Sequence, residues 1–242
     1  MALPTVVAAG AYAEGTADIV PGLPAGWAAD DIHVLFVEQS AVNDEGVDPT
    51  GYTQIGAYTR PASTATDPGM TIYWRRAVAG DGNPTVPDTV NHTSAIIVGV
   101  RGCITTGDPF DAFFHSTENV IDTTYSVTGL TTTVVDCLVL GVAMHGIDAL
   151  GADQFSALAN ADLGSLAEIA GTDRSTALGN GGGFVVFSGT KAAIGAFGAS
   201  TLTGPNGTKA MSHIAFRPPV GADVRPSGLL VVNQALDRAS NY

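Results

Sequence analysis

The residues of this 242-residue chain best suited to chemistry are five histidines, two cysteines and a loop of acidic side chains. No histidine is followed two or four positions later by a second potential ligand, the spacing by which one strand or helix presents two metal ligands. Each histidine is therefore predicted to be structural, and no metal site is expected. The five are His33, His92, His115, His145 and His213.

The acidic loop contains Asn43, Asp44, Glu45 and Asp48. Carboxylate and amide oxygens can bind calcium, but the regular spacing of a calcium-binding loop is missing, so a solvated loop is the favoured interpretation.

The two cysteines, Cys103 and Cys137, each lie in or beside an apolar run. Buried reduced thiols are predicted at both positions, and a disulfide between them is the alternative. Neither belongs to a metal-ligand pattern.

Recognised catalytic motifs are missing from the sequence. It has no nucleophile elbow, zinc-protease motif, phosphate loop or dinucleotide-binding fingerprint. The GNGGG run at residues 179–183 lacks the fingerprint spacing, so a hairpin or bulge is expected there. A glycoside hydrolase would need two carboxylates on either side of a groove, at a separation that the sequence does not give. We predict no catalytic residue, no cofactor and no enzyme activity.

Exposed aromatic side chains are the remaining candidates for ligand contact, because β-sandwiches often bind sugars through aromatics on loops. The candidate glycan contacts are Trp27, Tyr52 and Tyr58, with Tyr73 and Trp74 as further aromatics of the same kind. Core packing explains most of them equally well.

Charge and hydropathy limit the partners. The formal net charge is −13 and the ten basic residues are scattered, which disfavours binding to nucleic acid. No run approaches the roughly 20 apolar residues of a membrane helix. The N-terminus lacks the charged region of a signal peptide. We expect a soluble protein that is made in the cytosol and does not insert into membranes.

The pattern of apolar runs and turns predicts an all-β fold. A buried strand over Ala95–Val100 is followed by a turn at Gly107-Asp108-Pro109. Phe110, Phe113 and Phe114 are then expected to fasten a loop to the sandwich or to a neighbouring subunit. Further strands are predicted at Ile32–Glu38, Tyr52–Tyr58, Met70–Ala77, Asp122–Thr128, Val134–Met144 and Phe184–Phe187.

Three segments have less regular patterns. A first strand between Pro4 and Glu14 is expected at a sheet edge or across a neighbouring subunit. Residues 148–170 are mixed, with a short helix around Phe155 or a strand at Leu166–Ala170. Asn206-Gly207 is predicted to form a hairpin between two strands, the second at Lys209–Phe216.

These elements predict a single antiparallel β-sandwich, jelly-roll or concanavalin-like, over residues 1–218. Pro218-Pro219 ends it, and residues 219–242 form an extended C-terminal arm. A lone apolar strand cannot bury itself, so we expect the arm to dock on the domain or on a neighbouring subunit; a loosely ordered tail is the alternative. The candidate subunit contacts are Leu229, Leu230, Val231, Val232, Leu236, Phe113 and Phe114.

Several segments together resemble a family of structural virion proteins of tailed bacteriophages and prophages. They are LPAGWAADDIHVLFVE (23–38), GYTQIG (51–56), TIYWRRA (71–77), VRGCITTGDPFDAF (100–113), ADLGSLAEI (161–169), GNGGGFVV (179–186) and TKAMSHIAFRP (208–218). These are core and turn residues, so the resemblance bears on the fold and carries no catalytic signature.

The resemblance implies a non-enzymatic structural protein displayed on the particle surface, as a capsid decoration or a tail or baseplate module. Its location would be the virion, assembled in the cytoplasm of the host bacterium. Its partners would be other virion proteins and further copies of itself, as a trimer or a pentamer. The alternative is a lectin-like adhesin of the virion that binds a host surface glycan during host attachment.

Overall fold

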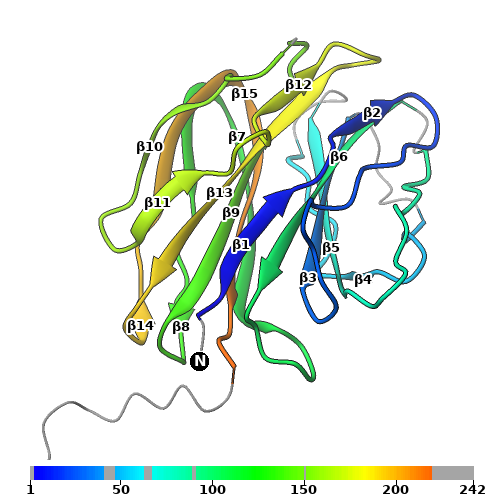
Figure 1. Ribbon diagram of the computed structural model, residues 1–242. Coiled ribbons are helices and arrows are strands. Elements are labelled where there is room, and N and C mark those ends of the chain that lie inside the picture. The colour runs from blue at the N-terminus through cyan, green and yellow to red at the C-terminus, as the bar shows by residue number, and fades with distance from the viewer. Residues whose placement is uncertain (1–2, 41–46, 63–66, 89–90, 150, 220–242) are drawn as a thin grey trace, which may run out of the picture.

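The computed structural model describes residues 3–40, 47–62, 67–88, 91–149 and 151–219. In these residues the chain forms strands and no helix, so no helix suited to crossing a membrane occurs among them. Two antiparallel sheets stand face to face (Figure 1). The predicted all-β sandwich is therefore confirmed, while the predicted arm lies outside the described residues.

The first sheet, sheet A, has the strand order β1-β6-β3-β5-β4, and β2 also pairs with β6. Its strands are β1 (Thr5–Ala9), β2 (Ala13–Gly15), β3 (Ile32–Ser40), β4 (Thr53–Gln54), β5 (Pro68–Arg76) and β6 (His92–Arg101).

The second sheet, sheet B, has the order β10-β15-β9-β13-β11; β12 pairs with β13, and β7 pairs with β15. Its strands are β7 (Phe110–Val127), β9 (Cys137–His145), β10 (Ser156–Ala159), β11 (Gly164–Glu168), β12 (Arg174–Thr176), β13 (Gly182–Lys191) and β15 (Ser200–Phe216). A separate pair joins β8 (Thr131–Thr132) to β14 (Gly195–Ala196).

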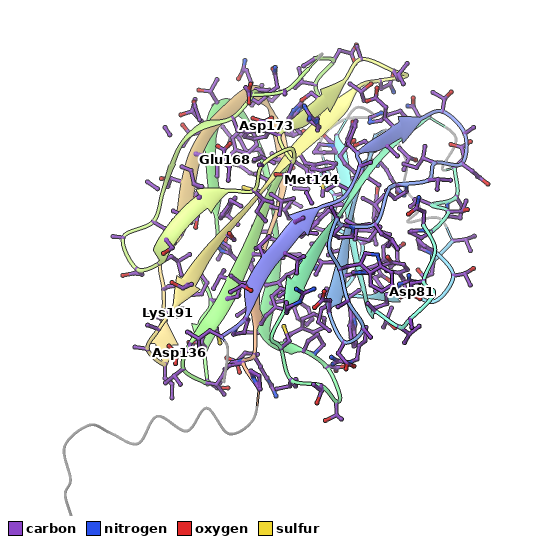
Figure 2. The ribbon with its side chains drawn as sticks, in the orientation of Figure 1. Asp81, Asp136, Met144, Glu168, Asp173 and Lys191 are labelled. Atoms are coloured by element: carbon purple, nitrogen blue, oxygen red, sulfur yellow. The ribbon has the colours of Figure 1, made fainter. Side chains whose placement is uncertain are left out.

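Strand β3 is apolar on both faces, which explains its central position in sheet A. Val34 and Phe36 point into the main core between the sheets, where Met144 of β9 also lies (Figure 2). Leu35 and Val37 point the other way, into a second cluster covered by loop residues such as Val86. Because successive side chains of a strand alternate between faces, an unbroken apolar run needs a core on each side.

The aromatic stretch after residue 109 is a strand, where a loop was predicted. Gly107 adopts a positive φ of 70°, as the predicted turn requires. Strand β7 then begins at Phe110, whose ring packs edge-on against Trp74 and Phe216, with centroids 5.3 and 5.6 Å away. Phe110 therefore anchors the start of β7 in the core, whereas Phe113 and Phe114 remain 43% and 49% exposed.

The hairpin predicted at Asn206-Gly207 is wrong. Residues 200–216 form one continuous strand, β15, and the Asn-Gly pair lies in an irregular stretch where the register with β7 shifts between Thr203 and Gly207. The apolar residues on both sides already pair with other strands, β7 on one edge and β9 or β10 on the other. A bulge therefore takes the place of the turn.

Two other local predictions are corrected or refined. Residues 148–170 form no helix in their described part; β10 and β11 occur there instead, because Phe155 and Leu163 are buried against sheet B. The strand predicted at Tyr52–Tyr58 shrinks to the two residues of β4, which lie at the sheet edge.

The GNGGG run and the N-terminal strand agree more closely with the predictions made from the sequence. The GNGGG run does connect a hairpin, between β12 and β13, with Gly179 and Gly181 at positive φ. The first strand is split into β1 and β2, and both pair with β6. The N-terminal segment therefore already has a partner within its own chain.

Gly141, in the middle of β9, provides a test of core packing. A Cβ at this position would overlap the ring of Phe187 on the neighbouring strand. We expect Gly141→Ala to lower the free energy of unfolding by about 1–3 kcal/mol, because the ring has to leave its well-packed position. Gly82→Ala is the control, since its Cβ would meet open space. Urea unfolding of both variants measures the difference, and equal midpoints would contradict the packing seen around Phe187.

Candidate interaction surface

The five histidines occupy separate structural positions, and no group of three or more metal-ligating side chains occurs in the described part of the chain. His145 contacts the Ser175 hydroxyl at 3.0 Å, and His213 lies between the Ser200 hydroxyl and the Thr128 carbonyl oxygen. Burial lowers the pKa of His145 to about 3 and that of His213 to about 4. Both are therefore neutral at pH 7.

His92 is the exception, because it forms a buried pair with Glu38. Its Nε2 lies 2.7 Å from Glu38 Oε2, and the Ser94 hydroxyl donates to the same oxygen at 3.0 Å. Burial alone lowers the pKa of His92, but the Glu38 carboxylate outweighs it and the net pKa is raised. Glu38, His92 and Ser94 are all 0% exposed, so this group stabilises the core and is not accessible to a substrate.

Cys103 and Cys137 are both free and buried, which confirms the predicted reduced thiols. Burial raises the pKa of each thiol to about 12. Because the thiolate is the reactive form, neither cysteine is suited to nucleophilic chemistry at neutral pH.

Strand β7 forms an edge of sheet B, and half of its residues are exposed. Its 18 residues pair along one side with β15, and within the described residues no other strand pairs with its outer side. Four of its apolar side chains, Phe113, Phe114, Val120 and Ile121, are 43–60% exposed. An edge of this length is normally covered or interrupted, because its free backbone groups can pair with another chain.

Two hollows flank the start of β7, and Phe113 lines both of them. The first, of about 440 Å³, is lined by Ile104, Phe110 and Arg217 among others. The second, of about 450 Å³, is lined by Phe114, Leu130 and Phe197 among others. Together they make a shallow surface on either side of the Phe113 ring; the first hollow also has charged residues in its lining, whereas the second is mainly apolar.

Hydrogen bonds of two β7 side chains attach this strand to the rest of the sandwich. His115 Nδ1 lies 2.8 Å from the Ser212 hydroxyl, and its Nε2 lies 2.7 Å from the Ile55 carbonyl oxygen. Asn119 accepts a hydrogen bond from the backbone nitrogen of Ala62. These contacts fix β7 to both sheets, so the exposed aromatics project from a defined backbone.

The predicted contact residues are distributed unevenly. Phe113 and Phe114 lie together on β7, whereas Leu229, Leu230, Val231, Val232 and Leu236 lie outside the described residues, as does most of the acidic loop at 43–48. The sequence did not indicate that β7 is an edge strand, because that status depends on the pairing of β15, which is distant in sequence.

The candidate glycan contacts do not share this surface. Tyr52 is only 7% exposed, and the guanidinium of Arg75 lies 4.9 Å from the centre of its ring. Trp27 is half-buried, with its ring edge-on to His33 at 5.4 Å, and Tyr58 is also half-buried. Neither hollow along β7 is lined by any of the three.

The fold and this surface define the class of protein as an all-β sandwich with a long exposed edge strand. No family model, no curated protein and no solved structure matches the chain.

Proposed function

We propose that the protein is a non-enzymatic structural subunit of a tailed-bacteriophage virion, displayed on the particle as a capsid decoration or a tail or baseplate module. The observation that carries the proposal is strand β7, an edge strand with exposed Phe113 and Phe114 beside two hollows. Such an edge suits permanent contact with other protein subunits, because both its backbone and its side chains can pair.

The charge of the chain fits the same role. A net charge of −13 keeps a subunit soluble at high concentration before assembly, and it repels the packaged genome. Between equally acidic copies, apolar and backbone groups suit a contact better than charged groups, and β7 exposes groups of both these kinds in Phe113, Phe114 and its outer edge.

Analysis of purified particles tests this proposal. Phage particles from the source bacterium are banded on a density gradient, and the protein is quantified by mass spectrometry against the major capsid protein. We expect many copies per particle and a constant ratio across the particle peak. Recovery of the protein only in the soluble fraction of the lysate would overturn the proposal.

A further inference from the structure

We propose that the apolar segment at residues 228–236 of a neighbouring copy adds as a strand to the outer edge of β7, over Phe113 and Phe114. The inference rests on the proposed structural role and deepens it, because it names the partner of this surface. The segment reads GLLVVNQAL.

The edge has the length and geometry for strand addition. Residues 112–118 of β7 pair with residues 209–215 of β15 without a register shift, so this part of the edge is regular. Strand β15 pairs on its other side with β9, so β7 is the terminal strand here among the strands that the structure describes. A seven-residue stretch is long enough for an ordinary strand.

At the start of this stretch, apolar side chains lie on both faces of the sheet. Phe113 lies next to Ile214 in the register and Phe114 next to His213, so the two rings point to opposite faces. Each ring borders a hollow. An added strand with alternating large apolar side chains can pack them against the two rings, on opposite faces of the sheet.

Residues 228–236 fit this edge in composition. The segment contains no charged residue and is rich in leucine and valine. It can therefore approach the carboxylates of Glu118 and Asp122 without like-charge repulsion, although each whole chain is strongly acidic.

The chain leaves the sandwich beside the same surface. The Arg217 amide donates to the Pro109 carbonyl oxygen at 2.8 Å, and the Ile104 amide donates to the Arg217 carbonyl oxygen at 3.2 Å. The described residues end two positions later, at the same end of the sandwich as the N-terminal strand (Figure 1). The eight residues 220–227 can span about 26 Å when extended.

The direction of the chain favours a neighbouring copy. The exit lies at the start of β7, so a segment that turned directly onto its own edge would run parallel to β7. Every described strand pair is antiparallel, and antiparallel pairs are slightly more stable per residue. A segment that arrives from a second copy can run antiparallel, and reciprocal exchange would close the assembly by symmetry.

Hydrogen exchange on the full-length protein tests the inference. The Leu230→Pro/Val232→Pro variant removes two backbone donors from the segment and prevents a regular strand. The Ala239→Pro/Asn241→Pro variant is the control, since both prolines lie beyond the segment. We expect amides in residues 112–118 to exchange at least about tenfold faster in the first variant than in the control, with exchange in β9 unchanged. Light scattering should show loss of the oligomer in the first variant alone.

The outcomes separate the inference from the proposed function. Equal exchange in β7 for both variants would overturn strand addition, and continued incorporation into particles would then leave the structural role standing. A monomeric wild-type protein whose β7 is protected by the segment would show that each copy covers its own edge, which overturns exchange between copies. Absence from particles would count against the proposed function whatever the exchange result.

Discussion

Lowering the pH from 7 to about 4 is expected to unfold the protein, because several histidines are buried in the neutral form. His33, His145 and His213 are 0% exposed. Burial lowers their pKa values from 6.5 to about 4, 3 and 4. The pKa of His115 is also lowered by burial.

The sign of the effect follows from proton linkage. Each of these histidines binds a proton in the unfolded chain near pH 6.5 but in the folded protein only at a much lower pH. Stability is therefore complete above about pH 6.5 and is lost as the pH falls towards the folded-state pKa. One pKa unit corresponds to about 1.4 kcal/mol, so His33 and His213 each account for about 3 kcal/mol. Together the buried histidines approach the whole stability of a typical domain.

Three other ionisable groups have the opposite effect, because they stabilise the folded protein as the pH falls. The raised pKa of His92 contributes stability that is present below pH 6.5 and lost as the pH rises through its folded-state value. Burial also raises the pKa values of Asp173 and Glu168, which lie towards one end of sheet B (Figure 2). Glu168 is largely exposed, so solvent weakens its effect. These groups reduce the loss of stability at low pH without removing it.

Urea unfolding between pH 7.5 and pH 4.5 measures the effect, and His33→Phe isolates one histidine. Among the described residues neither nitrogen of His33 has a hydrogen-bond partner, so phenylalanine can replace the ring without leaving a partner there unsatisfied. We expect the variant to lose about 2.5 kcal/mol less than the wild type over this range, because pH 4.5 is still above the folded-state pKa of His33. Thr71→Val is the control, because Thr71 is buried, its hydroxyl also has no partner in the described part of the chain, and it does not titrate. A flat midpoint from pH 7 to pH 4.5 in the wild type would refute the assignment.

The strands that could be predicted from sequence are those buried on both faces. Strands β3 and β9 consist of nearly unbroken apolar runs, which only a two-sided core explains. Strand β7 has no such signal, because it is half exposed and carries Asp111, Glu118 and Asp122 among its apolar residues. Its formation depends on pairing with β15, about 90 residues later in the chain, and local patterns do not report such pairings.

The same limit applies to the candidate surface. The sequence indicated Phe113 and Phe114 as contact residues because exposed aromatics need an apolar partner. It did not reveal that they lie on a sheet edge, nor that Lys209 is buried beneath that edge. Lysine is almost always exposed, and only the register of β15 against β7 places two carboxylates beside its ammonium group.

Removing both of those carboxylates is expected to destabilise the protein strongly. The side chain of Lys209 is 0% exposed, and its Nζ lies 2.8 Å from Asp122 Oδ1 and 3.5 Å from Glu118 Oε2. It also donates to the Val120 carbonyl oxygen at 2.8 Å. In the Glu118→Gln/Asp122→Asn variant the buried ammonium group loses both opposite charges, and we expect the Tm to fall by about 10 °C.

Replacing the lysine itself should have a much smaller effect, and this asymmetry distinguishes a buried charge from an ordinary surface ion pair. In Lys209→Met the two carboxylates remain, but Asp122 and Glu118 are 43% and 30% exposed and can be solvated. We expect a loss of at most about 3 °C, mainly from the contact with the Tyr125 ring. Adding the two carboxylate substitutions to Lys209→Met should then change the Tm by less than about 2 °C, since no buried charge is left to compensate. If the Glu118→Gln/Asp122→Asn variant, with Lys209 unchanged, were as stable as the wild type, this would show instead that Lys209 reaches solvent. Its ion pairs with the two carboxylates would then contribute little to stability.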